Sequence, residues 1–308
     1  MKKIAIVLVS CIMGIGILFT GCSGKQQNSK NEEVEKEENT TQVAENDLFT
    51  QDDNEDKEEL SFEDVNIIEN ELINRDDDSY TEIISDFRIT NKGENNIDYF
   101  SADFAYFDGG GNQICTDGRY HDCQIESGKS AIVTTYSRLD GKDKSLISDI
   151  ELISYVYRIG DKEYSVNLQT KEVSKSDSYY ATSNVDFDSA NVLQFNINLV
   201  GVNLINSFEA DVQIQNNGQN PIKYCSYRME YYDAEGNSLS GDGRYSDTLL
   251  NPGNYNQSKS FCDEKQSGNV ADCSVYSYDY DLVDVDANGF NHYEINTQTK
   301  TAIGSKKE

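Results

Sequence analysis

Short runs of alternating apolar and polar residues, bounded by glycine, asparagine or aspartate, recur along most of the chain. Two of these runs are Phe87–Thr90, which stops at Asn91-Lys-Gly93, and Val212–Gln215, which stops at Asn216-Asn-Gly218. Alternation with a period of two is typical of strands that are buried on one face. No stretch of the chain sustains a helical period. The pattern therefore predicts an all-β protein built from short antiparallel strands.

The second half of this pattern repeats the first. Residues 87–128 align without gaps with residues 212–253, and 17 of the 42 aligned positions are identical. A further match joins Tyr164–Lys171 to Tyr293–Lys300. The chain is therefore a tandem duplication, with predicted domains at 61–173 and 179–303. Each copy, at about 115 residues, is long enough to bury a core of its own.

Each copy carries seven or so strand signals, which favours an immunoglobulin-like antiparallel β-sandwich. The chain has no Trp, so the Cys-Trp-Cys framework of antibody domains is missing. The segments Phe104–Asp108 and Met229–Asp233, each followed by a turn that ends in Gly-Asn, resemble the FxLYD-type domain. Tyr stands where that family has Leu, and Phe107 and Met229 replace its Tyr and its leading Phe. The resemblance implies an immunoglobulin-like fold in a bacterial surface protein and implies no catalytic residues.

The amino terminus resembles the signal of a bacterial lipoprotein. A basic Met1-Lys2-Lys3 precedes the apolar stretch Ile4–Phe19, which is short for a membrane span. Phe19-Thr20-Gly21-Cys22 is similar to a lipobox, with Phe19 where the family usually has Leu. The resemblance implies that residues 1–21 are removed as a signal peptide and that Cys22 carries lipid chains such as palmitate. The protein would then be anchored at the extracytoplasmic face of the membrane. An ordinary secretory signal is the alternative.

An acidic segment follows the predicted anchor. Residues 22–60 contain many Glu and Asp and almost no large apolar side chain, so they are predicted to be a disordered tether. The alternative is that the acidic run is itself a binding tail. The whole chain has 55 Asp plus Glu against 26 Lys plus Arg and a net charge of -29. That charge excludes nucleic acid as a partner, because a phosphate backbone attracts basic surfaces.

Catalytic signals are missing from the sequence. Its two histidines, His121 and His292, have no counterparts in the other copy, and no nucleophile motif of the G-x-S-x-G kind occurs. Carboxylates are so frequent that pairs of them do not indicate glycoside hydrolysis. The chain is predicted not to be an enzyme and to need no cofactor, apart from the calcium site considered below.

A polar segment is duplicated without change, as Asp117-Gly-Arg-Tyr120 and Asp242-Gly-Arg-Tyr245. We expect it to form a loop in each copy. One interpretation is a shared recognition loop that binds through Arg119, Tyr120, Arg244 and Tyr245. The favoured interpretation is structural: Gly makes the turn, Tyr caps the core, and Arg pairs with an acid such as Asp108 or Asp233.

The cysteines of an exported protein can form disulfides. Cys115 and Cys123 flank the Asp-Gly-Arg-Tyr segment of the first copy, and both have counterparts other than cysteine in the second. Because both cysteines are present in one copy and both are absent from the other, they were gained or lost as a pair, which suggests a disulfide bond between them. In the second copy Cys262 and Cys273 are the predicted pair, and Cys225 is predicted to be a buried thiol. The odd number of cysteines leaves these assignments open.

A candidate calcium loop lies near the carboxyl end. Asp284, Asp286 and Asn288, followed by Gly289, match the first half of an EF-hand loop. Ile295 stands where the bidentate glutamate of that motif belongs, and no helices flank the loop. The favoured interpretation is a polar hairpin turn, and any calcium binding is predicted to be no tighter than the millimolar range.

These patterns together predict a membrane-anchored extracytoplasmic lipoprotein with a non-catalytic binding or envelope-associated role. Its partners would be the membrane, through the lipid anchor, and a protein or cell-wall component of unknown identity. A solute- or carbohydrate-binding lipoprotein is the alternative. It is disfavoured because solute receptors need α/β lobes around a cleft and because no Trp is present to stack on sugars. A surface enzyme is the remaining alternative.

Overall fold

The computed structural model describes residues 60–77, 82–137, 143–178, 183–262 and 265–307. The predicted signal peptide, Cys22 and nearly all of the acidic segment lie outside these residues. The described residues belong to one compact unit and consist mostly of strands, so the all-β prediction is confirmed. No helix in this part of the chain is long and apolar enough to cross a membrane.

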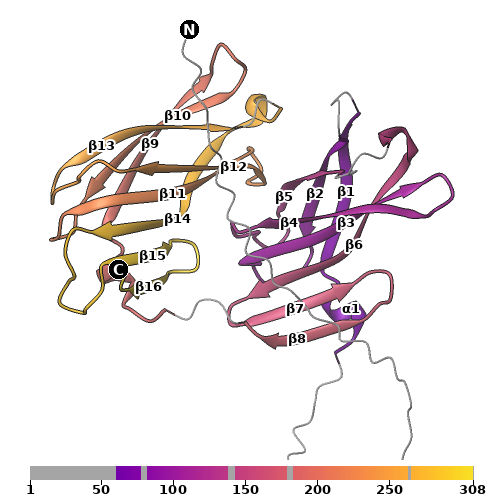
Figure 1. Ribbon diagram of the computed structural model, residues 1–308, viewed down its shortest axis with the longest axis horizontal. Helices are drawn as coiled ribbons and strands as arrows, with labels where there is room; N and C mark the ends of the chain where they lie inside the picture. Colours follow the sequence, from indigo (N-terminus) through magenta and orange to yellow (C-terminus); the bar gives the residue numbers. More distant parts are fainter. Residues whose placement is uncertain (1–59, 78–81, 138–142, 179–182, 263–264, 308) are drawn as a thin grey trace, which may run out of the picture. The chain divides into compact units, whose positions relative to one another are not determined.

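The first copy forms two antiparallel sheets (Figure 1). Its three-stranded sheet has the order β1-β2-β5, and its five-stranded sheet has the order β4-β3-β6-β7-β8. The strands are β1 Ile68–Asp76, β2 Ile84–Asn91, β3 Tyr99–Asp108, β4 Gln113–His121, β5 Ser130–Tyr136, β6 Ile147–Ile159, β7 Lys162–Asn167 and β8 Val173–Asp177. A short helix, α1 Phe62–Val65, precedes them, and the 3-10 turn η1 Lys144–Leu146 precedes β6.

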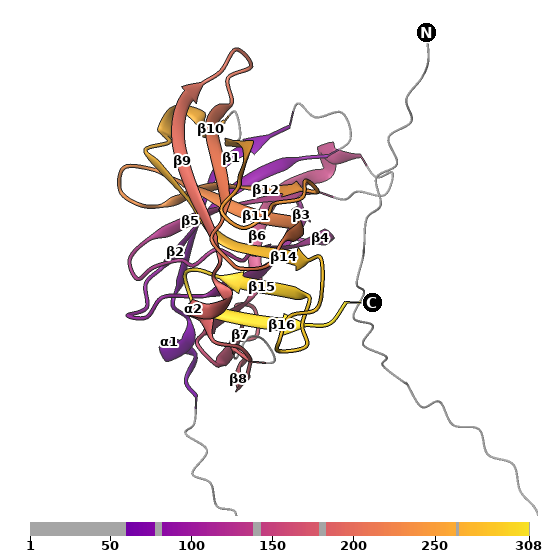
Figure 2. The same ribbon diagram turned by 90° about the vertical axis from the view of Figure 1, so that its left-hand side faces the viewer.

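The second copy repeats this arrangement strand for strand. Its sheets have the orders β9-β10-β13 and β12-β11-β14-β15-β16, and Figure 2 shows the five strands of the larger sheet in this order. The elements are α2 Phe187–Ala190, β9 Leu193–Val202, β10 Phe208–Asn216, β11 Ile222–Tyr232, β12 Ser238–Ser246, β13 Tyr255–Cys262, η2 Ser267–Asn269, β14 Asp272–Leu282, β15 His292–Asn296 and β16 Thr301–Ser305.

The strand order is that of an immunoglobulin-like sandwich. In chain order, the first, second and fifth strands of each copy make one sheet, as strands A, B and E do in that fold. The third, sixth and seventh strands make the other sheet, as C, F and G do, and the fourth strand pairs with the third. The eighth strand is an addition at the free edge. The prediction of two tandem immunoglobulin-like β-sandwiches is confirmed.

Each sandwich is filled by aromatic side chains, and two buried tyrosines of each copy hydrogen-bond to the end of its short helix, whereas the hydroxyl of Tyr227 has no partner among the described residues. Tyr155 and Tyr157, on β6, are buried and donate to Asn66 Oδ1 (2.7 Å) and to the carbonyl oxygen of Val65 (3.1 Å), at the end of α1. In the second copy the buried Tyr278 and Tyr280, on β14, do the same with the end of α2. The short helices therefore supply acceptors that allow these four tyrosines to occupy the core without an unsatisfied polar group.

The two sandwiches are joined by one parallel bridge. Ser238, at the start of β12, pairs with Ala131, on β5. This bridge extends the three-stranded sheet of the first copy into the five-stranded sheet of the second and makes an eight-stranded sheet. The bridge places the end of β4 and the segment before β5 next to strands of the second copy, which is where the candidate site lies.

Candidate functional site

The duplicated Asp-Gly-Arg-Tyr segment lies in strands β4 and β12 rather than in loops, so the loop prediction is wrong. In the first copy Asp117 is buried, and one of its oxygens accepts three hydrogen bonds. The donors are Arg119 Nε (2.6 Å), Thr135 Oγ1 (2.9 Å) and the backbone N–H of Tyr136 (2.8 Å). The carboxylate therefore ties β4, an edge strand of one sheet, to β5 in the other sheet.

The second copy repeats these contacts. Asp242 accepts from Arg244 Nε (2.7 Å), Ser260 Oγ (2.8 Å) and the backbone N–H of Phe261 (2.9 Å). The guanidinium of Arg244 lies over the ring of Phe261, as that of Arg119 lies over Tyr136. We call each set of contacts an aspartate clasp. The arginines thus pair with the aspartate of their own motif, and the predicted pairing with Asp108 or Asp233 is wrong.

The tyrosines of the motif do not cap the cores, contrary to the favoured interpretation. Tyr120 and Tyr245 are 64% and 72% exposed. Tyr245 stacks on Tyr224, with ring centroids 6.4 Å apart. The two arginines are engaged in the clasps. Of the four predicted binding residues, the two tyrosines are therefore the ones whose side chains are largely exposed to solvent. A recognition role for them stays a prediction.

Asp108 and Asp233 instead close turns of one kind, and the candidate calcium loop is a third example. In each turn one aspartate, Asp108, Asp233 or Asp286, accepts from the backbone N–H groups two and four residues later. In the third turn these donors belong to Asn288 and Phe290, and the other oxygen of Asp286 accepts from the hydroxyl of Tyr293. The carboxylate of Asp286 is thus engaged within the protein, while Asp284 and Asn288 are exposed. Calcium binding here stays a prediction.

Neither predicted disulfide is present, and no other disulfide joins cysteines within the described residues. Cys115 lies within β4 and Cys123 lies two residues beyond its end. Residues 115–121 are extended and span about 20 Å, and the two residues that follow can bring Cys123 back by no more than about 8 Å, whereas bridged Cα atoms lie about 4.4–6.8 Å apart. Cys262 and Cys273 belong to opposite sheets of the second copy and pack in its core, where thiols behave as small apolar groups. Cys225 is buried, as predicted.

The segment that follows β4 contacts the second copy through several polar groups. Asp122 accepts from the hydroxyl of Tyr276 (2.6 Å) and pairs with Arg228. The backbone N–H of Gln124 donates to Gln298 Oε1 (2.8 Å). We call this contact region between the copies, built on residues 121–131 of the first copy, the seam. Its direct hydrogen bonds hold the two sandwiches in a defined register.

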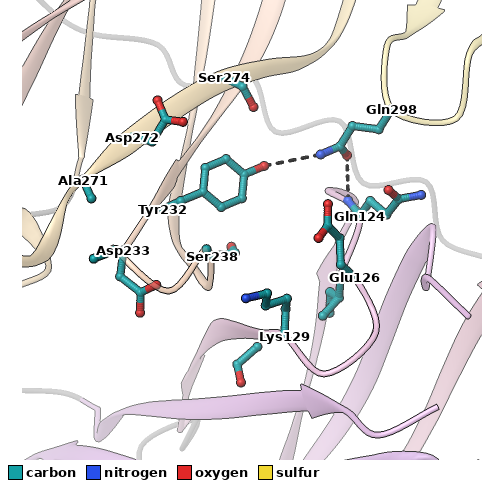
Figure 3. Close-up of a pocket in the computed structure, with 14 residues that line it drawn as sticks. Gln124, Glu126, Lys129, Tyr232, Asp233, Ser238, Ala271, Asp272, Ser274 and Gln298 are labelled. Atoms are coloured by element: carbon teal, nitrogen blue, oxygen red, sulfur yellow. Dashed lines mark hydrogen bonds between the residues drawn. The ribbon is translucent and has the colours of Figure 1, made fainter. Parts of the chain in front are cut away.

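A pocket of about 440 Å³ opens at the seam. Figure 3 shows Gln298 bridging the hydroxyl of Tyr232 and the backbone of Gln124 at its rim. Lys129 lies across from Asp233 in this view, and its ammonium group donates to the carbonyl oxygen of Glu235. The lining is mostly polar and contains both acidic and basic groups, so the pocket suits water and small polar molecules rather than an apolar ligand.

Three titratable groups meet in the interior beside this pocket. One ligand-type atom from each of His121, Cys123 and Glu230 lies within 4.8 Å of those of the other two. Burial lowers the pKa of His121 to about 4 and raises the pKa of Glu230 to about 8. Burial raises the pKa of the Cys123 thiol to about 12, and the carboxylate of Glu230 adds to this shift. Near neutral pH the three groups are therefore uncharged in the absence of a cation.

Sequence reasoning missed this cluster, although a signal for it was present. His121 and Cys123 align with Ser246 and Thr248, and Glu230 aligns with Ala105, so all three belong to one copy only. The duplicated positions build what both sandwiches share, such as the clasps. Positions that differ between the copies mark the surfaces that each copy uses alone, and the seam is such a surface.

The comparisons with known proteins add little to this geometry. No protein-family model matches the chain, and no curated protein matches it. Solved structures with some likeness include an Amycolatopsis orientalis exo-chitosanase, with 12% identity over 69% of this chain and 25% of that one, and a TM-score of 0.19. The red sea bream transglutaminase has 10% identity over 70% and 29%, with a TM-score of 0.20. The chain thus spans less than a third of the length of these structures.

Proposed function

We propose that the protein is a lipoprotein anchored through Cys22 at the extracytoplasmic face of the membrane, and that its two sandwiches form a non-catalytic module that binds a protein partner. The basic start, the apolar stretch and the Gly21-Cys22 step support the anchor. The FxLYD-like segments support a surface location. The acidic residues 22–60 would hold the module away from the anionic headgroups.

The observation that carries the binding role is an exposed apolar hairpin in the second copy. Strand β9 and the turn into β10 expose Val200, Val202, Leu204 and Ile205, and Leu204 is fully exposed. In Figure 2 this hairpin extends beyond the rest of its sandwich. Contiguous apolar groups on a surface mark an interaction site. The corresponding end of β1 and the turn after it carry Arg75-Asp-Asp77 in the first copy, so the feature is specific to the second.

The edge strand next to this hairpin favours an extended peptide as the occupant. β9 is the outer strand of its sheet, and none of its ten residues is charged or a proline. Natural proteins usually protect such edges with lysine, proline or other charges, and the equivalent strand β1 carries Glu69, Glu71 and Arg75. An uncharged segment of a partner could add to β9 as a further strand. The net charge of -29 disfavours an anionic lipid surface as the occupant.

Replacement of the lipidated cysteine tests the anchor. Cys22→Ala should release the protein from the membrane fraction, because the acyl chains supply the attachment at about 0.8 kcal/mol for each buried methylene group. The measurement is fractionation of cells that express the full chain, with Cys225→Ser as a cysteine substitution that leaves the anchor intact. Membrane retention of Cys22→Ala with an intact signal would contradict the anchor.

Site-specific photo-crosslinking tests the binding surface. A photoreactive residue at Leu204 of the full chain in cells should give a discrete protein adduct. Val202→Lys should reduce that adduct at least tenfold, because it places a charge beside the uncharged edge. Leu249→Lys, at an equally exposed position of the same copy, serves as the matched control and should leave the adduct unchanged. Adducts with lipid alone, or a protein adduct that Val202→Lys does not reduce, would rule out the peptide-binding edge.

A further inference from the structure

The cluster at the seam consists of groups that are costly to bury. Cys123 and Glu230 are 1% and 3% exposed, and His121, at the end of β4, is partly buried as a residue. Among the described residues no basic side chain forms an ion pair with Glu230, whose carboxylate accepts a hydrogen bond from Ser238 Oγ. A carboxylate in the interior without a cation is unfavourable. The arrangement therefore suits an occupant that brings positive charge.

Space for the carboxylate is built into the facing strand. A Cβ atom on Gly241, on β12, would lie 2.9 Å from Glu230 Oε2, so the carboxylate keeps its present position only because this residue is glycine. The aligned residue of the first copy is Thr116, which faces Ala105 in place of a glutamate. The pair Glu230 and Gly241 thus lies at the seam, whereas the aligned pair in the first copy, Ala105 and Thr116, contains no carboxylate.

We infer that His121, Cys123 and Glu230 form a zinc(II) site that links the two copies. An imidazole nitrogen, a thiolate and a carboxylate oxygen are the three ligand types that Zn²⁺ takes in proteins, whereas Ca²⁺ and Mg²⁺ take oxygen ligands. Bond lengths of about 2.0–2.3 Å place the ligands of a tetrahedral ion roughly 3.3–3.8 Å apart. The three atoms, now within 4.8 Å of one another, reach that spacing by small side-chain rotations.

The surrounding hydrogen bonds suit such an ion. Cys123 Sγ lies 3.3 Å from the hydroxyl of Tyr232 and 3.5 Å from Gln298 Nε2, and both groups can donate to a thiolate. Ser238 Oγ lies 3.5 Å from His121 Nε2 and also contacts Glu230, so it stands beside the fourth coordination position. Water or this hydroxyl would complete the tetrahedron. Binding of Zn²⁺ displaces the protons of the Cys123 thiol and the Glu230 carboxyl to solvent.

The position of the site defines its role. Two of the ligands belong to the first copy and one to the second, so the ion fastens the sandwiches at the seam. The pocket in Figure 3 is lined by Tyr232, Ser238 and Gln298, which touch the cluster, and it offers a path from solvent. The zinc site requires neither the lipid anchor nor the edge of β9.

Metal titration of the purified full chain in detergent, after removal of metals with a chelator, tests the site. We expect one Zn²⁺ bound per chain by calorimetry. Substitution with Co²⁺ should give the thiolate-to-cobalt charge-transfer band and the visible bands of a tetrahedral site. Cys123→Ser and Glu230→Gln should each weaken Zn²⁺ binding by more than about tenfold. Cys225→Ser, which removes a buried thiol outside the cluster, should leave the affinity unchanged.

Glu230→Gln keeps the test informative if Cys123→Ser misfolds, because the amide has the shape of the carboxyl group and carries no charge. Far-UV dichroism of each variant monitors the fold. The site would be ruled out by the absence of stoichiometric Zn²⁺ binding, by a Co²⁺ complex without the thiolate band, or by binding that survives in the folded Glu230→Gln variant.

Discussion

Asp117→Ala should destabilise the first sandwich by roughly 3–5 kcal/mol, the range for breaking a buried ion pair by removing one partner. The carboxylate is the common acceptor of Arg119, Thr135 and the backbone of Tyr136. Alanine leaves all three donors without that acceptor, and Thr135 is fully buried, so water does not replace it easily. Chemical denaturation followed by far-UV dichroism measures the loss of unfolding free energy.

Two comparison variants separate the clasp from a general effect of losing an aspartate. Asp242→Ala removes the clasp of the second copy, whose carboxylate is 16% exposed against 3% for Asp117. Its cost should be smaller, because Arg244 is 35% exposed and water can hydrate its guanidinium once the carboxylate is removed. Asp103→Ala removes an exposed carboxylate from the neighbouring strand β3 and should change stability by less than about 0.5 kcal/mol. Equal effects of Asp117→Ala and Asp103→Ala would show that the clasp contributes nothing.

The clasp also shows why the fold was predictable and the role of the motif was not. Alternation and duplication are local signals, and they predicted two all-β sandwiches. Two of the three partners of Asp117 lie 18 and 19 residues further along the chain, on a strand of the other sheet. Asp-Gly-Arg has the composition of a turn, but the buried acceptor network and the pairing of β4 with β3 keep it extended. Tertiary contacts therefore overrode a local preference that indicated a loop.

The seam could not be predicted from the sequence for a different reason. Contacts between tandem copies are heterologous, so a surface of one copy meets a different surface of the other. A comparison of the copies therefore shows such residues only as differences, as with His121 and Ser246. The absence of a counterpart for His121 argues against a catalytic site shared by both copies and says nothing about a contact between them. The structure places it where the copies meet, and there a lone residue is what heterologous packing requires.

Glu230→Gln should stabilise the metal-free protein at pH 8, the second large effect that we expect. Because burial raises the pKa of Glu230 to about 8 from 4.5, the folded protein holds a proton that the unfolded chain releases above pH 4.5. The stability that this group contributes is complete below pH 4.5 and is lost as the pH rises through 8. Cys123, with a pKa of about 12, keeps its proton in both states over this range.

The titration of His121 determines the pH interval in which this loss of stability can be measured. Burial lowers its pKa from 6.5 to about 4, so this group contributes stability above pH 6.5 that is lost as the pH falls through 4. Between pH 4.5 and 6.5 the folded state holds one proton on Glu230 and the unfolded state holds one on His121. The two slopes therefore cancel in this interval. Above pH 6.5 only the Glu230 slope remains, at about 1.4 kcal/mol per pH unit.

Urea denaturation at several pH values, with a chelator present, tests this balance. The wild-type protein should lose roughly 2 kcal/mol of unfolding free energy between pH 6.5 and 8. Glu230→Gln should show no loss from this source in that interval, and its stability should rise with pH from 4.5 to 6.5 because the His121 slope is no longer opposed. Glu151→Gln, which removes an exposed carboxylate from β6, should keep the wild-type profile. Parallel profiles for wild type and Glu230→Gln would mean that Glu230 is ionised in the folded protein and that the seam already contains a compensating charge.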